Sequence, residues 1–189
     1  MTERDYQRKY LRAPYWQYVL FLDKGHVFKG RGLNISEGGI LLDEIGHLPE
    51  DEVNDFLVYL PEYPLFKNYN FEKIMNFNPE HFTGQSIRFK AKLVRRNNSS
   101  NHVNGVFLSQ IGFEMVEISK VNLMKLSHYI DVFSGNLIYL QVLLDNINSD
   151  KNNLLKFRKL ASYLGHNYEE KLSVMRVNIE HEYKSLQWL

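Results

Sequence analysis

The chain has 189 residues, of which 44% are hydrophobic, and a formal net charge of +1. These values fit a globular domain with a sizeable core, and they exclude a chain that is disordered throughout. The absence of cysteine excludes disulfides and cysteine-ligated metal and fits a reducing compartment. A polar N-terminus and the lack of any window of roughly 18 apolar residues predict a cytoplasmic protein without signal peptide or membrane span.

The charge is unevenly distributed along the chain. Residues 1–31 carry a net +4 and residues 81–96 a net +5, whereas residues 37–80 between them carry −8. Two short basic segments around an acidic one suit a small anion or a charged protein surface better than a nucleic-acid polymer. Ordinary variation of a solvated surface explains each run about as well, so charge alone leaves these interpretations open.

About six strands are predicted before residue 119. Aromatic and branched residues at 15–22, a turn at 23–25 and a return strand at 26–30 predict a hairpin, with Trp16 in the core. Further strands are predicted at 40–42, 53–60, 86–94 and 106–116, with turns at 36–39 and 97–101. Residues 61–84 contain Pro61, Pro64, Pro79 and many aromatics, and are predicted to form a long packed loop. The spacing is typical of a small antiparallel barrel or sandwich.

From Ser119 onward the apolar spacing becomes helical. One helical run continues past Gly135 to Ile147, and Ser149-Asp150 is predicted to cap a second helix that Gly165 ends or kinks. The last segment places apolar residues at alternating steps of four and three: Tyr168, Leu172, Met175, Ile179, Tyr183 and Leu186. This narrow stripe fits packing on the barrel, self-association as a coiled coil or the binding of a partner helix, and the sequence leaves all three open.

Two short motifs are candidates for a binding site. Arg8 and Arg12 lie in a basic arm before the first predicted strand, and Asn34, Ser36 and Gly39 surround a predicted turn. An arginine fork pairs with phosphate or with the O6 and N7 edge of guanine, and Asn34 offers a donor and an acceptor. Ser36 supplies a hydroxyl, and Gly39 leaves room where a Cβ would intrude. The set suits a compact anionic guanine nucleotide better than a catalytic centre.

The order of these elements resembles the PilZ domain family. The resemblance covers roughly residues 4–132 and is carried by Arg8-x-x-x-Arg12-Ala13-Pro14 and Asn34-x-Ser36-x-x-Gly39. It implies a β-rich α+β protein: a six-stranded antiparallel PilZ-type β-barrel over residues 1–132, followed by an α-helical C-terminal extension over residues 133–189. Asn34 stands where the family more often has aspartate. The shifted pair Arg4-x-x-x-Arg8 also fits the first motif, but Arg8 and Arg12 are preferred because Arg12-Ala13-Pro14 leads directly into the first predicted strand.

The resemblance also implies a function. The chain would be a non-enzymatic bacterial effector that binds cyclic di-GMP through Arg8, Arg12, Asn34, Ser36 and Gly39 and needs no further cofactor. Binding would fold the arm over the nucleotide and change a surface that an unknown protein partner reads. The alternative is an interaction or oligomerisation module that works mainly through its C-terminal helices, with weak or no nucleotide binding.

No other constellation in the sequence predicts catalysis or a metal site. The seven histidines lack zinc-binding spacing, and neither a phosphate-binding lysine loop nor a serine-nucleophile elbow occurs. The acidic run over residues 43–52 is predicted to be a solvated surface. Arg88, Lys90 and Lys92 share one face of a predicted strand and could add positive potential near a phosphate.

Overall fold

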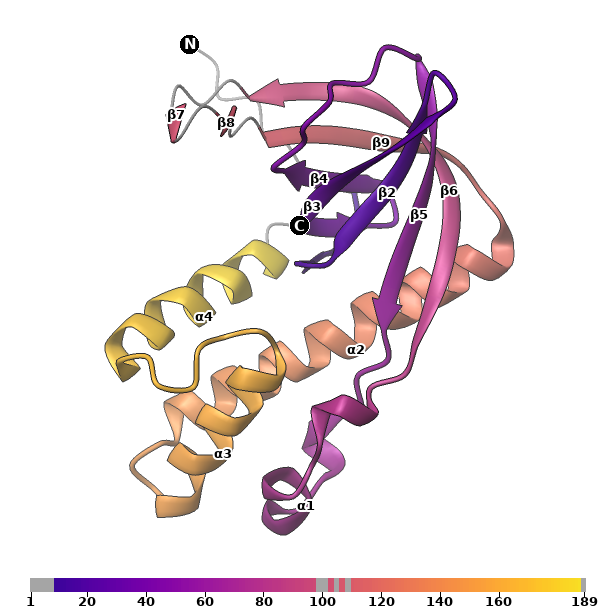
Figure 1. The fold of residues 1–189 in the computed structure, drawn as a ribbon. Coiled ribbons are helices and arrows are strands. Elements are labelled where there is room, and N and C mark those ends of the chain that lie inside the picture. The colour runs from indigo at the N-terminus through magenta and orange to yellow at the C-terminus, as the bar shows by residue number, and fades with distance from the viewer. Residues whose placement is uncertain (1–8, 98–101, 104–105, 108–109, 188–189) are drawn as a thin grey trace. The chain divides into compact units, whose positions relative to one another are not determined.

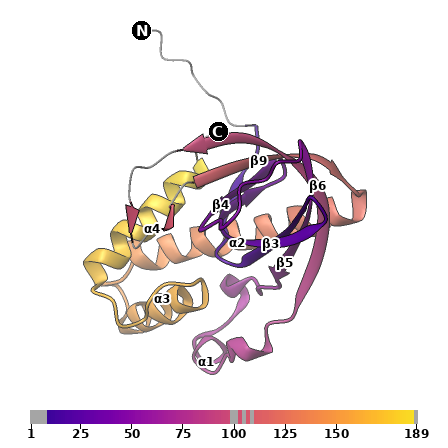
Figure 2. The same cartoon turned by 45° about the horizontal axis from the view of Figure 1, so that its top comes forward.

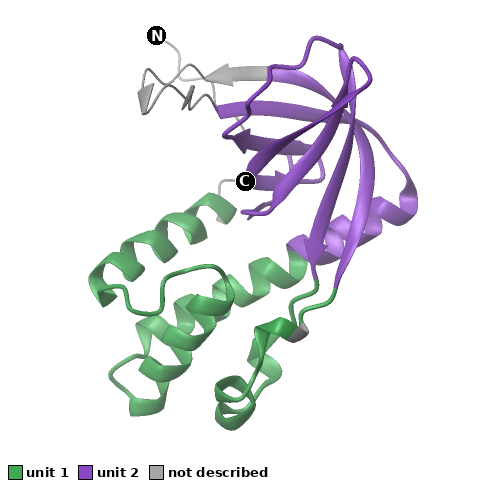
Figure 3. Cartoon of the chain, viewed as in Figure 1, with its two compact units in different colours: residues 1–7, 62–83, 131–189 green, residues 8–61, 84–130 purple. Residues whose placement is uncertain are grey.

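The computed structural model describes residues 9–97, 102–103, 106–107 and 110–187 (Figure 1). The chain divides into two compact units, shown in Figure 3. The barrel unit takes in the described residues of 8–61 and 84–130, and the helical unit takes in those of 62–83 and 131–189. Residues 62–83 thus group with the C-terminal helices, although the sequence assigned them to the domain ending at residue 132.

All strands of the barrel unit pair in antiparallel fashion. The described strands are β1 (Arg12–Pro14), β2 (Tyr18–Asp23), β3 (His26–Ser36), β4 (Gly39–Asp43), β5 (Val53–Pro61), β6 (Gly84–Asn97), β7 (His102–Val103), β8 (Val106–Phe107) and β9 (Gln110–Ile118). The single strand predicted at 106–116 is wrong, since β8 and β9 share that stretch. Most of the turn predicted at 97–101 lies outside the described residues.

The main sheet closes on itself (Figures 1 and 2). Its order is β1-β3-β2-β5-β6-β9-β4, and β4 returns to pair with β3. The predicted six-stranded antiparallel β-barrel is therefore confirmed. Because side chains alternate across a strand, one residue in two points inward. Phe56 packs at the centre of the core, with ring centroids 5.7 Å from Phe21, 5.4 Å from Phe89 and 4.9 Å from Phe113.

Besides the six strands of the closed barrel, the sheet contains the short strand β1. It pairs with the same side of β3 as β2 does, and the two strands lie end to end. At Arg31, β3 pairs with β2 on one side and with β4 on the other, and at Ser36 it pairs with β1 and β4. Both β1 and β2 therefore lie on the side opposite β4. Backbone hydrogen bonds from Tyr15 N to Leu33 O (3.0 Å) and from Gly32 N to Gln17 O (2.9 Å) bridge the interval. The arm thus enters the barrel in line with its first long strand.

The helical unit forms much as the periodicity predicts. Helix α2 (Lys120–Asp145) runs through Gly135, and its residues 120–130 belong to the barrel unit. The Asp150 side chain accepts from Asn152 N at 2.9 Å and caps α3 (Lys151–Tyr163), as predicted. Gly165, with φ of +98°, follows the end of α3. None of the described helices is long and apolar enough to cross a membrane.

The predicted loop at 61–84 contains three short helices, so that prediction is wrong in part. They are η1 (Phe66–Asn68), α1 (Phe71–Met75) and η2 (Pro79–His81). The aromatic residues pack, as predicted: the Phe66 ring centroid lies 5.6 Å from Phe77 and 5.5 Å from Tyr163. The Tyr163 hydroxyl donates to the carbonyls of Ile74 (2.9 Å) and Phe77 (2.7 Å). This segment is thereby fixed within the helical unit.

The C-terminal stripe falls on α4 (Leu172–Gln187), apart from Tyr168, which precedes it. Met175, Ile179 and Leu186 are buried in the single chain. A coiled coil through this stripe would require these side chains to leave their buried positions, which favours packing within the chain. Self-association through the helices stays a prediction.

Candidate functional site

The two predicted motifs meet in the β1–β3 pairing. Arg12 is the Cα partner of Ser36, and Pro14 is the partner of Asn34. Ala13 and Ile35, the intervening pair, are fully buried and point into the barrel. Because alternate residues point to opposite faces, Arg12, Asn34 and Ser36 lie together on the other face, where Arg12 and Asn34 are half-buried and Ser36 is buried. Arg8 lies outside the described residues.

The turn between β3 and β4 is held by the Ser36 hydroxyl. Ser36 Oγ accepts from Gly38 N and donates to Gly39 O, both at 3.3 Å. A Cβ at Gly38 would lie 2.6 Å from the Tyr10 ring, so the arm packs directly on this turn. A Cβ at Gly39 would clash with the carbonyl oxygen of Phe113 on β9. The space beside both glycines is thus filled by the protein, and Gly39 permits the close approach of β4 to β9.

Helix α2 contacts both halves of this candidate site within the barrel unit. The Ser127 hydroxyl donates to the Glu37 carboxylate, which belongs to the turn. The Tyr129 hydroxyl donates to Pro14 O at 3.0 Å, and this hydrogen bond is buried. The Tyr129 ring also meets Tyr15 edge-on, with centroids 6.2 Å apart. No pattern in the sequence indicates these hydrogen bonds, because their partners lie 90 and 115 positions apart in the chain.

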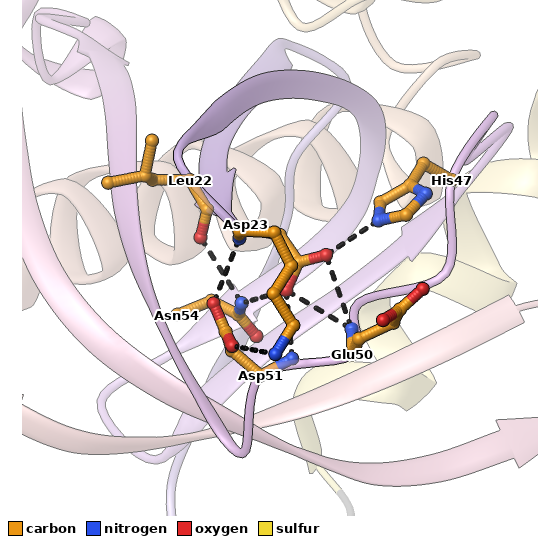
Figure 4. A network of polar contacts seen from close by, with 7 residues as sticks. Leu22, Asp23, His47, Glu50, Asp51 and Asn54 are labelled. Carbon is orange, nitrogen blue, oxygen red and sulfur yellow. Dashed lines mark hydrogen bonds and ion pairs between the residues drawn. The ribbon is translucent and has the colours of Figure 1, made fainter.

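A second polar cluster, not predicted from the sequence, surrounds the buried carboxylate of Asp23 (Figure 4). Its oxygens accept from His47 Nε2 (2.6 Å), Asp51 N (2.8 Å), Glu50 N (3.1 Å) and Asn54 Nδ2 (3.1 Å). Burial alone would raise the pKa of Asp23, but the hydrogen bonds from Asp51, His47, Glu50 and Asn54 hold that pKa well below its ordinary value. The network ties the loop before β5 to the β2–β3 turn.

The acidic run lies largely on the surface, as predicted, with Asp43 as its buried acidic residue, and several of its residues form ion pairs there. Asp51 pairs with Lys24 at 2.8 Å, while Asp43 and Glu44 pair with Arg31 at 2.8 and 3.0 Å. The Arg31–Asp43 hydrogen bonds raise the pKa of the guanidinium above its ordinary value. The run therefore neutralises cations of the neighbouring strands.

The cations of β6 are partly neutralised as well. Lys90 pairs with Glu117 at 3.1 Å and Lys92 with Glu114 at 3.0 Å. Their contribution to a positive potential is correspondingly smaller than their number indicates. Among the residues that the structure describes, no group of three or more histidine, aspartate or glutamate side chains could hold a metal ion.

No protein-family model and no curated protein matches the chain significantly. Several solved structures are similar to it, including the two that follow. The Bacillus subtilis inhibitor of motility, MotI/DgrA, is 20% identical with a TM-score of 0.46, and the match covers 66% of this chain and 49% of that one. The PilZ domain of YcgR from Escherichia coli, solved with c-di-GMP, is 15% identical with a TM-score of 0.40, and the match covers 68% and 90%. The chain thus spans about half the length of the first protein.

Proposed function

We propose that the chain is a PilZ-type effector of the bacterial cytoplasm that binds cyclic di-GMP without catalysing a reaction. The observation that carries the proposal is the register of β1 on β3, which brings Arg12 opposite Ser36 and beside Asn34 on the face that points away from Ala13 and Ile35. An arginine fork, an amide and a hydroxyl on one face match the phosphates and base edges of a guanine nucleotide.

The binding residues would be Arg8, Arg12, Asn34, Ser36 and Gly39. The two arginines would pair with phosphate or with guanine O6 and N7, and Asn34 would bond a base edge. Charge-assisted hydrogen bonds contribute about 1.5–3 kcal/mol each. A few such bonds would leave micromolar affinity or better after the cost of association is subtracted.

Ligand binding would be coupled to helix α2. Tyr129 holds the strand that follows the arm, and Ser127 holds the turn, so both elements of the site contact the same turn of α2. A ligand that draws the arm toward the turn would change the separation of Pro14 and Glu37. Because α2 is one helix from Lys120 to Asp145, it would carry that change beyond the barrel unit. A partner protein would then bind the surface that this change exposes or reshapes.

Titration calorimetry of the full chain with cyclic di-GMP tests the proposal. Arg12→Ala and Ser36→Ala are each expected to weaken binding at least about tenfold, because each removes one ligand contact. Lys29→Ala is the matched control, since Lys29 is an exposed cation on the same strand β3. Cyclic di-AMP is expected not to bind, because adenine lacks the O6 acceptor.

Two outcomes would refute the site. One is the absence of heat on adding cyclic di-GMP to the folded wild-type chain. The other is wild-type affinity in both Arg12→Ala and Ser36→Ala.

A further inference from the structure

Strand β2 is apolar on both of its faces. Val19 and Phe21 point into the barrel and are buried, while Tyr18, Leu20 and Leu22 point outward and are 60%, 41% and 41% exposed. The outer face of an antiparallel sheet is usually polar. Packing in the barrel core explains why the inward side chains are apolar, but it does not explain why the outward side chains are apolar as well.

The register joins these outward residues to apolar residues of the neighbouring strands. Leu20 is the Cα partner of Leu57 on β5, and Leu22 is the partner of Val27 on β3, which is 67% exposed. Tyr59, two residues beyond Leu57 on the same face of β5, is 42% exposed. We call this continuous surface the outer strip, comprising Tyr18, Leu20, Leu22, Val27, Leu57 and Tyr59. The three strands lie side by side in Figure 1.

The outward residues of β6 show the contrast. Ser86, Arg88 and Lys90 are polar and follow the usual pattern of a solvated sheet. The strip therefore ends at a definite border. A contiguous exposed apolar surface with a polar rim is typical of a site that contacts a protein, a membrane or a ligand.

The rim of the outer strip is cationic on both sides. The central cross-strand row runs Lys29, Leu20, Leu57, Arg88, so that one cation stands at each end. Lys29 Nζ lies 4.9 Å from the centroid of the Tyr18 ring, which keeps that charge at the strip's edge. Lys29 and Arg88 form no ion pair within the part of the chain that the structure describes. They are therefore available to a carboxylate from outside.

The neighbouring rows carry less positive charge. Arg31, opposite Tyr18, is already held by Asp43 and Glu44. In the row of Leu22, Asp55 faces Lys90, and Lys90 also pairs with Glu117. The cationic excess is thus concentrated at the ends of the Leu20 row, and this fixes where a partner's acidic groups must fall.

We infer that the outer strip is a docking surface for an amphipathic segment of a partner protein whose apolar side chains are bordered by Asp or Glu. The apolar residues of that segment cover Leu20, Leu57 and Tyr18. Its carboxylates reach Lys29 on one side and Arg88 on the other. This inference does not depend on nucleotide binding, since none of these residues belongs to the proposed nucleotide site.

Two labelled synthetic peptides of 18 residues serve as probes, measured by fluorescence anisotropy against the full chain. Both carry a leucine stripe at helical spacing, flanked by Glu in one peptide and by Lys in the other. The Glu peptide is expected to bind at least about tenfold more tightly, with affinity that falls as salt is added. Leu20→Ser is expected to weaken its binding at least about tenfold, and Arg88→Glu to remove the preference for Glu over Lys.

Val116→Ser is the control variant, because Val116 is a similarly exposed apolar residue (45%) on another strand of the barrel. It should bind the Glu peptide as the wild type does. Thermal unfolding of each variant confirms that it is folded, as expected for changes on the outer face. Equal affinity for the two peptides, or equal loss in Val116→Ser and Leu20→Ser, overturns the inference.

Two further measurements separate the other possible occupants. Light scattering that shows a wild-type dimer, converted to monomer by Leu20→Ser, would assign the strip to a second copy of this chain. Co-sedimentation with vesicles of anionic lipid that is lost in Leu20→Ser and Arg88→Glu would assign it to a membrane surface. Either result overturns the protein-partner inference.

Discussion

Arg12 and Ser36 stand directly opposite each other as Cα partners, although 23 residues separate them in the chain. The pairing is made by β1, a strand of only three residues that continues the line of β2. After β1 the chain runs outward along β2, turns, and returns along β3 until it lies beside β1 again. The number of residues between the two motifs is therefore set by the combined length of β2 and β3. Two elements that the sequence offers separately are in this way joined by backbone hydrogen bonds.

The fork of Arg12, and not only its charge, should matter for the proposed ligand. Arg12→Lys keeps the positive charge but loses the planar pair of donors, so we expect cyclic di-GMP affinity to fall about tenfold or more. Calorimetric titration measures the affinity, and urea unfolding checks that stability is unchanged. Retention of full affinity in Arg12→Lys would show that charge alone is read at this position.

Substituting Gly39 tests the close packing of β4 against β9, and substituting Gly46 serves as the control. A Cβ at Gly39 meets the Phe113 carbonyl, whereas a Cβ at Gly46 meets nothing within 4 Å. Gly39→Ala should therefore lower the free energy of unfolding by about 1–3 kcal/mol, and Gly46→Ala should change it by less than about 1 kcal/mol. Urea denaturation followed by circular dichroism gives both values. Similar effects of the two substitutions would contradict the clash at β9.

The buried Asp23 carboxylate predicts a loss of stability in acid. Its pKa is lower in the folded chain than in the unfolded chain, so the unfolded chain takes up the proton first as pH falls. The stabilisation is complete above the ordinary value of 3.8 and is lost progressively below it. Urea midpoints measured from pH 7 to pH 2 should show this fall in the wild type.

Asp23→Asn isolates the contribution of that carboxylate. The variant should be less stable than the wild type at pH 7 and should show a shallower decline below pH 4. Asp55→Asn is the control, since Asp55 is an exposed acid on β5. If the stability of Asp23→Asn falls with pH as steeply as that of Asp55→Asn, the loss of stability in acid arises from groups other than Asp23.

Tyr129→Phe tests the contact between α2 and β1. It removes one hydroxyl and leaves the buried Pro14 carbonyl without its donor, which should cost about 1–3 kcal/mol of stability. Hydrogen exchange should also show weaker protection at β1. Tyr139→Phe, at a half-buried position farther along α2, is the control. Unchanged exchange at β1 in Tyr129→Phe would mean that the helix does not hold this strand.

The strands of the barrel could be predicted because their residues alternate or are densely branched and aromatic. The strand β6 shows this best, since Ile87, Phe89 and Ala91 are buried between exposed polar neighbours. Strand β1 was missed because three residues that include a proline carry no periodicity. Trp16 was predicted to lie in the core but is 38% exposed, since it falls in the interval between β1 and β2.

The short helices at 62–83 were missed for a different reason. Prolines and asparagines there suggest a loop, yet Asn70 caps α1 by accepting from Lys73 N at 2.8 Å. Asparagine is a common helix-capping residue, but α1 is only five residues long, which is too short for its apolar residues to show helical periodicity. The contacts of Ser127 and Tyr129 could not be predicted at all, because tertiary packing alone brings them to residues 90 and 115 positions away.

The tight fit at Gly39 bears on how related chains should be recognised. A glycine that the close approach of β4 to β9 requires would be retained even in a related chain that does not bind the proposed ligand. The arginines of the proposed site would be retained only where the ligand is still bound. A search for functional relatives should therefore weigh the cationic half of the pattern above the glycine half.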